Sequence, residues 1–466
     1  MKSFAIVCGS AISDVQKKAV SVLSEILLDG TVKYPYVITY DETADLSSYR
    51  CIYIGTKESN PYIRAHSDAV LSHAEGYVIR IKNDTVVIEG ADDRGVLYGC
   101  MDFYNEFVLK VEHPGDEVRY VHNCFEKPFP DFERISHPAV RDRGIWTWGH
   151  VIYDYRGFID NLVRLKMNTL ILWNDRVPFN AREIVAYAHS CGVKVIWGYA
   201  WAWNNGCKNV DLATLCDRSV PLFEQYEREY ADIGADGIYF QSVTEFNKET
   251  IDGVLIADAV TQFVNHTAGL FFDKYPDLEL QFGLHATSVK HRLEYIGKVD
   301  PRIRIVWENC GAFPFSYTPY DVAKFDETKE FVSRIAHLRG EDDRFGVVTK
   351  GLTKLYWPEF EHMEAPMHVG VSSERMQQNR ITRKHRIWKY LQAYWITHAD
   401  YVSDMIRLMA KEKDGDLYIT ALVEDGMFEK EIMYPVALYS EMLWSPERDV
   451  KDVMSMVALR DYVTFA

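Results

Sequence analysis

Two glutamates occur at or just after apolar runs that are typical of buried parallel strands. Glu245 lies near the end of DGIYFQSVTEF (236–246), and Glu308 lies within IRIVWENCG (303–311). Cleaving a glycosidic bond takes two facing carboxyl groups, a protonated acid for the leaving oxygen and a nucleophile or base. We therefore interpret Glu245 as a candidate acid and Glu308 as a candidate nucleophile or base. The alternatives are a loop acid at 245 and a buried, salt-bridged acid at 308.

A series of strands separated by helices must position these residues. Segments such as YRGFIDNLVRLKM and AREIVAYAHSCG have helical spacing and end in short turns. Eight parallel strands with helices between them are what a (β/α)8 TIM barrel requires. A doubly wound open sheet is the alternative, but no GxGxxG follows any strand. The eight expected strands are 144–149, 169–174, 193–201, 237–242, 278–284, 303–311, 345–351 and 417–424.

A smaller α/β domain precedes the predicted barrel. Residues 1–128 alternate about five strands with amphipathic helices, the first of which stops at Gly30. The proline-rich segment that follows predicts a linker over 129–142. We assign the catalytic barrel to 143–446 and a tail packed on the barrel to 447–466. The fold class is thus α/β, with an accessory domain in front of a TIM barrel.

Aromatic and polar residues gather at the carboxyl ends of the predicted strands, where barrels of this kind place their sites. Tryptophan faces stack on sugar rings, and carboxylates bind hydroxyl groups. Filling of the barrel core is the alternative role for the tryptophans, and ordinary turn or loop acids are the alternative for the carboxylates. The candidate substrate-binding residues at these ends are Asp175, Trp201, Trp307, Trp357 and Glu424.

Composition excludes several other classes of function. The formal charge of −16 argues against partners such as nucleic acid or an anionic membrane. The short apolar start predicts a strand, and the eight cysteines form no CxxC pair, so we expect reduced thiols in the cytoplasm. Neither HExxH nor GxSxG occurs, and no cofactor or metal is expected. A metal-dependent hydrolase that uses the histidines is a further alternative to a glycosidase.

Several motifs resemble glycoside hydrolase family 20, the β-hexosaminidases, and less directly the family 67 α-glucuronidases. The segment EGYVIRIKNDTVVIEGADDRGVLYG is similar to their accessory domain, and YPVALYSEMLWSPERD to their closing helix. The entry VRDRGIWTW resembles a strand whose arginine binds sugar hydroxyls, which implies that role for Arg143. The resemblance at the closing helix implies that Glu424, in the strand before it, is a hydroxyl ligand. Strand VWENCGAFPF is more similar to family 67, which supports Glu308.

One position departs from the family 20 pattern. Family 20 has an Asp-Glu pair after the fourth strand, where the aspartate orients the acetamido group that acts as nucleophile. This chain has Thr244-Glu245 instead. We therefore expect a glycosidase that uses two carboxylates on a carbohydrate substrate such as a short oligosaccharide or glycoside. A catalytically inactive carbohydrate-binding barrel and a substrate-assisted N-acetylhexosaminidase are the alternatives.

Overall fold

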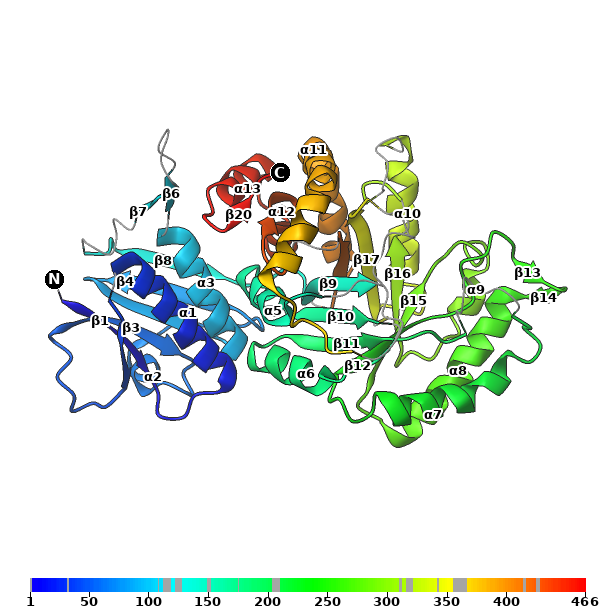
Figure 1. Cartoon of the computed structure of the whole chain (residues 1–466), viewed down its shortest axis with the longest axis horizontal. Helices are drawn as coiled ribbons and strands as arrows, with labels where there is room; N and C mark the ends of the chain where they lie inside the picture. Colours follow the sequence, from blue (N-terminus) through cyan, green and yellow to red (C-terminus); the bar gives the residue numbers. More distant parts are fainter. Residues whose placement is uncertain are drawn as a thin grey trace.

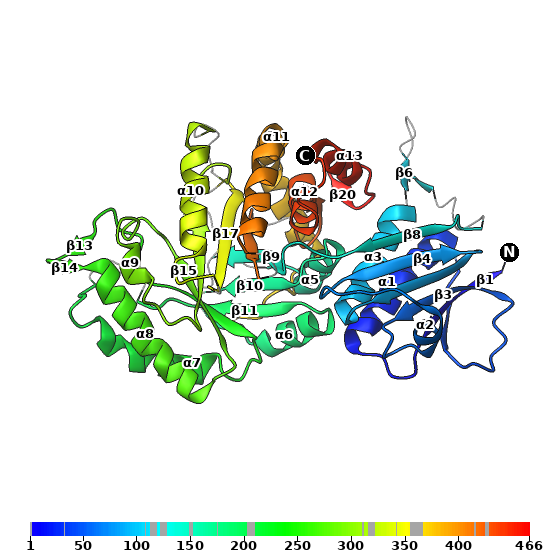
Figure 2. The same cartoon turned by 180° about the vertical axis from the view of Figure 1, so that it is seen from behind.

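A computed structural model gives the fold of the chain. It describes all residues except 1, 32, 108, 112–118, 122–127, 149–151, 175, 203–209, 310–311, 316–321, 342, 355–366, 414–415 and 425–427. Figures 1 and 2 show an amino-terminal sheet domain beside a closed barrel.

The accessory domain is built on a six-stranded sheet with the order β2-β1-β3-β5-β4-β8. The first four strands in this order are parallel, and β4 runs antiparallel to both of its neighbours. Phe4 and Ile6 face helices α1 and α3, while Ala5 and Val7 face the other side, as the period of two requires. The bounds are β1 (Ser3–Cys8), α1 (Asp14–Thr31), β2 (Tyr36–Thr39), β3 (Tyr49–Gly55), α2 (Pro61–His66), β4 (Tyr77–Lys82), β5 (Thr85–Gly90), α3 (Asp93–Phe107) and β8 (Phe132–Ser136).

Strand β8 lies in the segment that was expected to be a linker. It pairs antiparallel with β4 from Phe132 to Ser136 and forms one edge of the sheet. The prolines at 128, 130 and 138 flank the strand instead of interrupting it, so its backbone donors remain available for pairing. The accessory sheet therefore has six strands and takes in part of 129–142. A short hairpin of β6 (Leu109–Val111) and β7 (Arg119–Val121) precedes it.

Eight parallel strands close the barrel in the order β10-β11-β12-β15-β16-β17-β18-β9. This confirms the TIM-barrel prediction, and every expected strand is present with ends that differ by a few residues. Strands β9 and β10 point away from the accessory domain (Figure 1), so their carboxyl ends lie on the far side. The strands are β9 (Asp142–Trp148), β10 (Thr169–Trp173), β11 (Lys194–Gly198), β12 (Gly237–Gln241), β15 (Glu279–Leu284), β16 (Arg304–Asn309), β17 (Phe345–Leu352) and β18 (Tyr418–Val423).

Helices surround the barrel. The longest described helix, α11, has 39 residues and is capped by Ser373, whose side chain accepts a hydrogen bond from the Met376 amide. The bounds are α5 (Tyr155–Arg164), α6 (Ala181–Ser190), α7 (Ser219–Glu229), α8 (Ile256–Lys274), α9 (Leu293–Ile296), α10 (Phe325–Ala336), α11 (Glu374–Glu412), α12 (Tyr434–Trp444) and α13 (Val450–Ala458). Short elements are η1 (Leu215–Arg218), β13 (Thr250–Ile251), β14 (Val254–Leu255), η2 (Val322–Lys324), β19 (Ile432–Met433) and β20 (Val463–Thr464).

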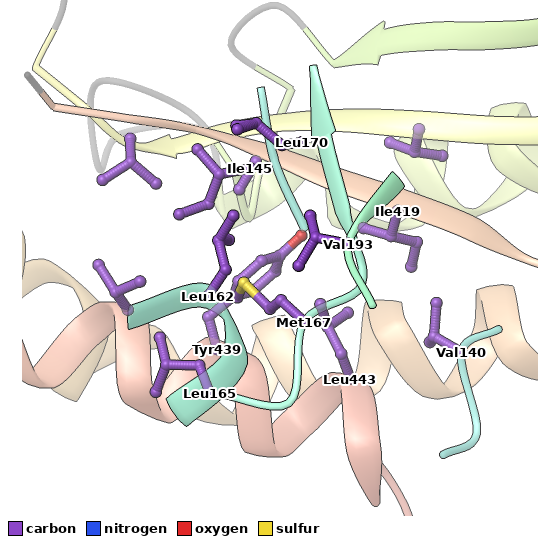
Figure 3. Packing of buried hydrophobic residues seen from close by; sticks show 14 of the residues in the cluster. Val140, Ile145, Leu162, Leu165, Met167, Leu170, Val193, Ile419, Tyr439 and Leu443 are labelled. Carbon is purple, nitrogen blue, oxygen red and sulfur yellow. The ribbon is translucent and has the colours of Figure 1, made fainter. Parts of the chain in front are cut away.

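Two apolar layers hold the barrel together. The outer layer packs strands against helices, and Figure 3 shows it where Ile145 and Leu170 meet Leu162 and the α12 residue Tyr439. The inner layer fills the barrel itself, so the barrel is a packed core and not a pore. Its members are Trp146, Ile171, Trp173, Ile196, Tyr239, Val306, Val348, Tyr418 and Leu422.

The carboxyl-terminal tail contacts both parts of the chain. Strand β20 pairs with β19 next to α12, and α13 packs on α12. The Tyr462 hydroxyl donates to Asn105 of the accessory helix α3, at 3.1 Å. The tail therefore joins the barrel to the accessory domain. Of the helices that the structure describes, none has the length and apolar character that crossing a bilayer demands.

Candidate active site

Five polar side chains meet at the carboxyl ends of four neighbouring barrel strands. Alternate residues of each strand point into the barrel, so Tyr239 and Gln241 of β12 share the interior with Glu308 of β16. Lys350 of β17 and His285, which directly follows β15, complete the group. The adjacency of these strands in the barrel brings residues up to 69 positions apart into contact.

Glu308 is the centre of this polar cluster, and its side chain is fully buried. Its Oε1 accepts hydrogen bonds from the Tyr239 hydroxyl at 2.6 Å and from the Gln241 amide. Its Oε2 lies 2.6 Å from Lys350 Nζ and 2.8 Å from His285 Nε2. Both oxygens of the carboxylate are thus held by donors from three other strands, which fixes the direction in which it points.

The cluster also sets the charge of Glu308. Burial on its own raises the pKa of this carboxyl, but the charges of His285 and Lys350 and their hydrogen bonds outweigh it. The pKa of Glu308 is therefore held well below its usual range. The residue is an ionised carboxylate at neutral pH, which suits a nucleophile better than a base.

Gly283 provides the space in which the Tyr239 hydroxyl reaches Glu308. A Cβ at this position would overlap the Tyr239 hydroxyl and lie 2.8 Å from Glu308 Oε1. We expect Gly283→Ala to displace Tyr239 and to lower the free energy of unfolding by about 1–3 kcal/mol, the usual cost of overpacking. Urea denaturation measures this effect.

Gly269 of α8 is the matched control, because a Cβ there meets no atom within 4 Å. Gly269→Ala should leave the stability unchanged or raise it by up to about 1 kcal/mol, since alanine is the better helix former. Equal stability of the two variants would contradict the close approach at Gly283.

Glu245 lies near His285, on the opposite side of the imidazole ring from Glu308. It follows β12 in the sequence, its side chain is 43% exposed, and its Oε1 is 4.0 Å from His285 Nδ1. His285 thus has one ring nitrogen toward each of the two predicted catalytic carboxylates. The structure brings Glu245 and Glu308 into one site, with the half-exposed glutamate nearer to solvent.

A cavity of about 360 Å³ opens beside this site. It is lined by His285, Trp307 and Glu308, by Phe313 and by residues of α10. Trp307 itself points outward from the barrel and packs on Phe331, with ring centroids 4.9 Å apart. Its placement beside Glu308 allows contact with a ligand in this cavity.

Glu424 directly follows β18 and is buried at the same end of the barrel. Its Oε2 accepts from the Thr353 hydroxyl at 2.7 Å, and its Oε1 from Lys384 at 2.9 Å. Its amide donates to the Leu352 carbonyl of β17, which ties it to the strand ends. The carboxylate is therefore fixed in place by α11 and the loop after β17.

The structure does not place Trp201 where the prediction needs it. Its side chain is fully buried outside the barrel, stacked on Phe240 with centroids 3.7 Å apart and packed against Phe271 of α8. A ring enclosed by two phenylalanines cannot stack on a sugar. The expected sugar-shaping role is corrected to core packing, because Trp201 points toward the helices and not toward the barrel axis.

Arg143 lies at the amino end of β9, opposite to the end that holds Glu308. It is buried, its Nη2 is 2.7 Å from Glu75 of the accessory domain, and its guanidinium lies over the Trp444 ring. The expected sugar contact is corrected to a domain-interface role. Arg143 lies three residues before Trp146, which points into the barrel, so the Arg143 side chain points outward. The direction of β9 also places it at the amino end of the barrel, away from the site.

Two of the predicted substrate-binding residues, Asp175 and Trp357, lie outside the described residues. Thr244 is buried, and its carbonyl accepts a hydrogen bond from the Ser288 amide.

Within the described ranges, no group of three His, Cys, Asp or Glu side chains is arranged to hold a metal ion.

Sequence reasoning gave no role to several residues that contact Glu308. Gln241, His285 and Lys350 stand at predicted strand ends, and Tyr239 lies two residues before Gln241 on the same strand. Positions of equal parity on one strand share a face, so Tyr239 and Gln241 both turn inward with Glu308. That parity was the available signal, since it also separates inward Glu308 from outward Trp307.

Comparison with known proteins gives one match to a family model. Residues 19–103, from within α1 to within α3, match the model described as "Glycosyl hydrolase family 67 N-terminus". No curated protein shows a significant sequence match to the chain. The match lies within the accessory domain and accords with the second of the two families that the sequence resembles.

Solved structures share the fold of the whole chain. A family GH115 4-O-methyl-α-glucuronidase, BtGH115A, with specificity for decorated arabinogalactans, is 14% identical, with a TM-score of 0.54 over 98% of this chain and 58% of that chain. A GH138 enzyme targeting pectin rhamnogalacturonan II is 12% identical, with a TM-score of 0.53 over 96% and 64%. CpGH84B is 12% identical, with a TM-score of 0.53 over 98% and 70%.

The chain spans about three fifths of the length of the first two of these proteins. At these identities the comparison concerns the fold, which is a barrel preceded by a sheet domain. The chain thus has a segment similar to the amino-terminal domain of family 67, followed by a (β/α)8 barrel whose fold is shared with these solved structures.

Proposed function

We propose that the protein is a glycoside hydrolase in which Glu245 is the acid and Glu308 the second carboxylate. The observation that carries this proposal is the pair of carboxylates on either side of His285 at the carboxyl end of the barrel. One is half-exposed and can meet a leaving oxygen, and the other is ionised and held rigidly. Together they supply the two functions that glycosidic cleavage needs.

The contacts with His285 also limit the separation of the pair. The nearest carboxyl oxygens lie at most about 9 Å apart, since one imidazole ring spans the gap, and glycosidases use about 5–9.5 Å. Glu424, fixed at the same end of the barrel, is the proposed hydroxyl ligand, and Trp307 is the proposed aromatic wall. The proposed substrate is a short oligosaccharide or glycoside.

Substrate-assisted cleavage of N-acetylhexosamines is the weaker version of this function. It needs a side chain beside the acid that orients the acetamido group. Thr244 occupies that place and is buried, and its hydroxyl group does not supply the carboxylate with which family 20 orients the acetamido group.

The described cysteines Cys8, Cys51, Cys100, Cys191 and Cys216 are all free thiols, which supports the proposed cytoplasmic location.

Glu245→Gln tests the assignment of the acid. Glutamine keeps the size of the side chain but cannot donate a proton, so hydrolysis of glycosides with poor leaving groups should fall about hundredfold or more. Glycosides with a dinitrophenolate leaving group need little acid assistance and should lose much less. The comparison of kcat/KM for the two substrate types is the measurement, and equal losses would exclude Glu245 as the acid.

A second candidate is a carbohydrate-binding barrel without catalysis. The observation in its favour is that the Glu308 side chain is fully buried with donors on both oxygens, which is also how structural carboxylates are held. This candidate predicts sugar binding by calorimetry with no turnover of any glycoside in a broad panel. Turnover that Glu245→Gln reduces would exclude it.

A further inference from the structure

Strand β2 forms one edge of the accessory sheet, and within the described residues only β1 pairs with it. Neither the motifs nor the comparisons assign this edge a role. We propose that two copies of the chain form a symmetric dimer through it, by antiparallel pairing of β2 with β2 of the second copy. The inference goes beyond the proposed function, because the edge belongs to the accessory domain and contains no residue of the barrel site.

The first observation is the direction of the backbone groups of β2. The Tyr40 amide donates to the Cys8 carbonyl at 2.8 Å, so the backbone of Tyr40 faces β1. Backbone groups alternate between the two sides of a strand, hence Ile38 also faces β1 in the register of this pair. The N–H and C=O groups of Val37 and Thr39 therefore point away from the sheet.

The second observation is that β2 lacks the usual protection of a sheet edge. Tyr36 and Val37 are 54% and 55% exposed, and Tyr34 just before the strand is 78% exposed. The strand YVIT contains no charged residue, although charges are a common device against association at sheet edges. The opposite edge, β8, has this device, since Glu133 and Arg134 lie within it. Of the two edges of the sheet, β2 is thus the one suited to a partner strand.

The third observation selects a second copy of this chain as the partner. Lys33 precedes the strand, Asp41 and Glu42 follow it, and all three residues are exposed. Two copies in antiparallel orientation bring the basic end of each strand near the acidic end of the other. A segment that is complementary to itself in this way fits a two-fold axis, at which the same surface serves both copies.

The outward backbone groups also determine the register. Both outward residues of β2 find a partner within the strand only if Val37 lies opposite Thr39 of the partner subunit. This register requires no N–H from Pro35, which has none. Ile38 then lies on the two-fold axis opposite the partner's Ile38, on the face where it already packs against an apolar cluster.

The size and charge of this interface set the expected strength of the dimer. One pair of short strands buries less surface than the about 1,200–2,000 Å² of a standard stable interface. Two chains with a formal charge of −16 also repel each other. We therefore expect a reversible dimer, whose fraction rises with protein concentration and is measured best at about 0.15 M salt, where long-range repulsion is screened.

Sedimentation velocity of the full chain is the first test. The sedimentation coefficient of the wild type should rise with concentration from the value of a monomer toward that of a dimer. Val37→Lys puts a charge in the edge and should keep the protein monomeric at every concentration, with an unchanged circular dichroism spectrum. Val70→Lys is the matched control, because Val70 is 83% exposed but lines the cavity between the accessory domain and the barrel.

Ile38→Cys tests the register. Directly opposite residues at a non-hydrogen-bonded antiparallel position have Cα atoms about 4.5 Å apart, within the range of a disulfide. Under mild oxidation, Ile38→Cys should therefore give disulfide-linked dimers about tenfold faster than Ile135→Cys, the matched exchange on the β8 edge. The wild type gives the background rate of its exposed Cys216.

The proposal is overturned by a wild type that stays monomeric at all concentrations, which would leave the edge to a segment of another protein. Association that Val37→Lys does not weaken, or equal cross-linking of Ile38→Cys and Ile135→Cys, would equally overturn it, because the dimer would then use another surface. Each result is read without a substrate, so it is independent of whether the protein hydrolyses a glycoside.

Discussion

Lys350→Met is expected to lower the free energy of unfolding by about 3–5 kcal/mol at pH 7, because it removes the buried cation beside Glu308. Methionine keeps the length of the side chain, so the loss reflects charge more than volume. Urea denaturation followed by tryptophan fluorescence measures it. The double variant Lys350→Met/Glu308→Gln should recover part of the loss, since it no longer buries a carboxylate without its cation.

The pH dependence of stability gives this prediction a sign. In the wild type the folded pKa of Glu308 is depressed, so its contribution is present above the unfolded value of about 4.3 and is lost only at more acidic pH. Without Lys350 the contacts of Glu308 with His285 remain, so the folded pKa should be depressed less than in the wild type, and less stability should be lost as the pH falls below about 4. Parallel curves for the two proteins would show that Lys350 does not control the charge of Glu308.

Arg143→Met is expected to cost a similar amount, about 3–5 kcal/mol, without changing KM for a glycoside. Arg143 is buried against Glu75, and Glu75 also contacts Arg94 at 2.9 Å and Asn168 at 2.8 Å. Removing the guanidinium breaks this network and the stacking over Trp444. KM should not change, because Arg143 stands at the amino end of the barrel.

Arg182→Met is the control for this variant. Its partner Asp232 and the arginine itself are both largely exposed, and such pairs contribute at most about 1 kcal/mol. A stable Arg143→Met protein with a raised KM would restore the sugar-binding role that the motif resemblance implied. Denaturation and steady-state kinetics on the same three proteins therefore separate an interface arginine from a substrate-binding one.

The sequence predicted the barrel well, because its strands are continuous apolar runs between helices of clear period, such as Thr169–Trp173 before Ala181–Ser190. It mistook β8 for a linker, since FERIS alternates polar and apolar residues between prolines. Glu245 and Glu308 stay predicted catalytic residues, chosen because they lie at or just after apolar strands whose carboxyl ends meet in one barrel. The predicted roles of Trp201 and Arg143 were wrong, because neither residue type nor motif shows which way a side chain points.

Contacts around Glu308 were harder to predict for another reason. Tyr239, Gly283 and Lys350 come from three strands, and only the closed barrel determines that they meet. Local sequence shows parity along one strand but not the register between strands. Predicting such a cluster from a single sequence would require the registers that pair Gln241 with Gly283 and Glu308 with Val348.

The contact of Arg143 with Glu75 has a consequence for how the chain folds. The counter-ion of a barrel-strand residue belongs to the accessory domain, and Tyr462 near the end of the chain contacts that domain too. A barrel produced without the accessory domain would bury a cation with no partner from that domain. The two domains should therefore unfold as one cooperative unit, in which the amino-terminal domain acts as a built-in folding partner for the barrel.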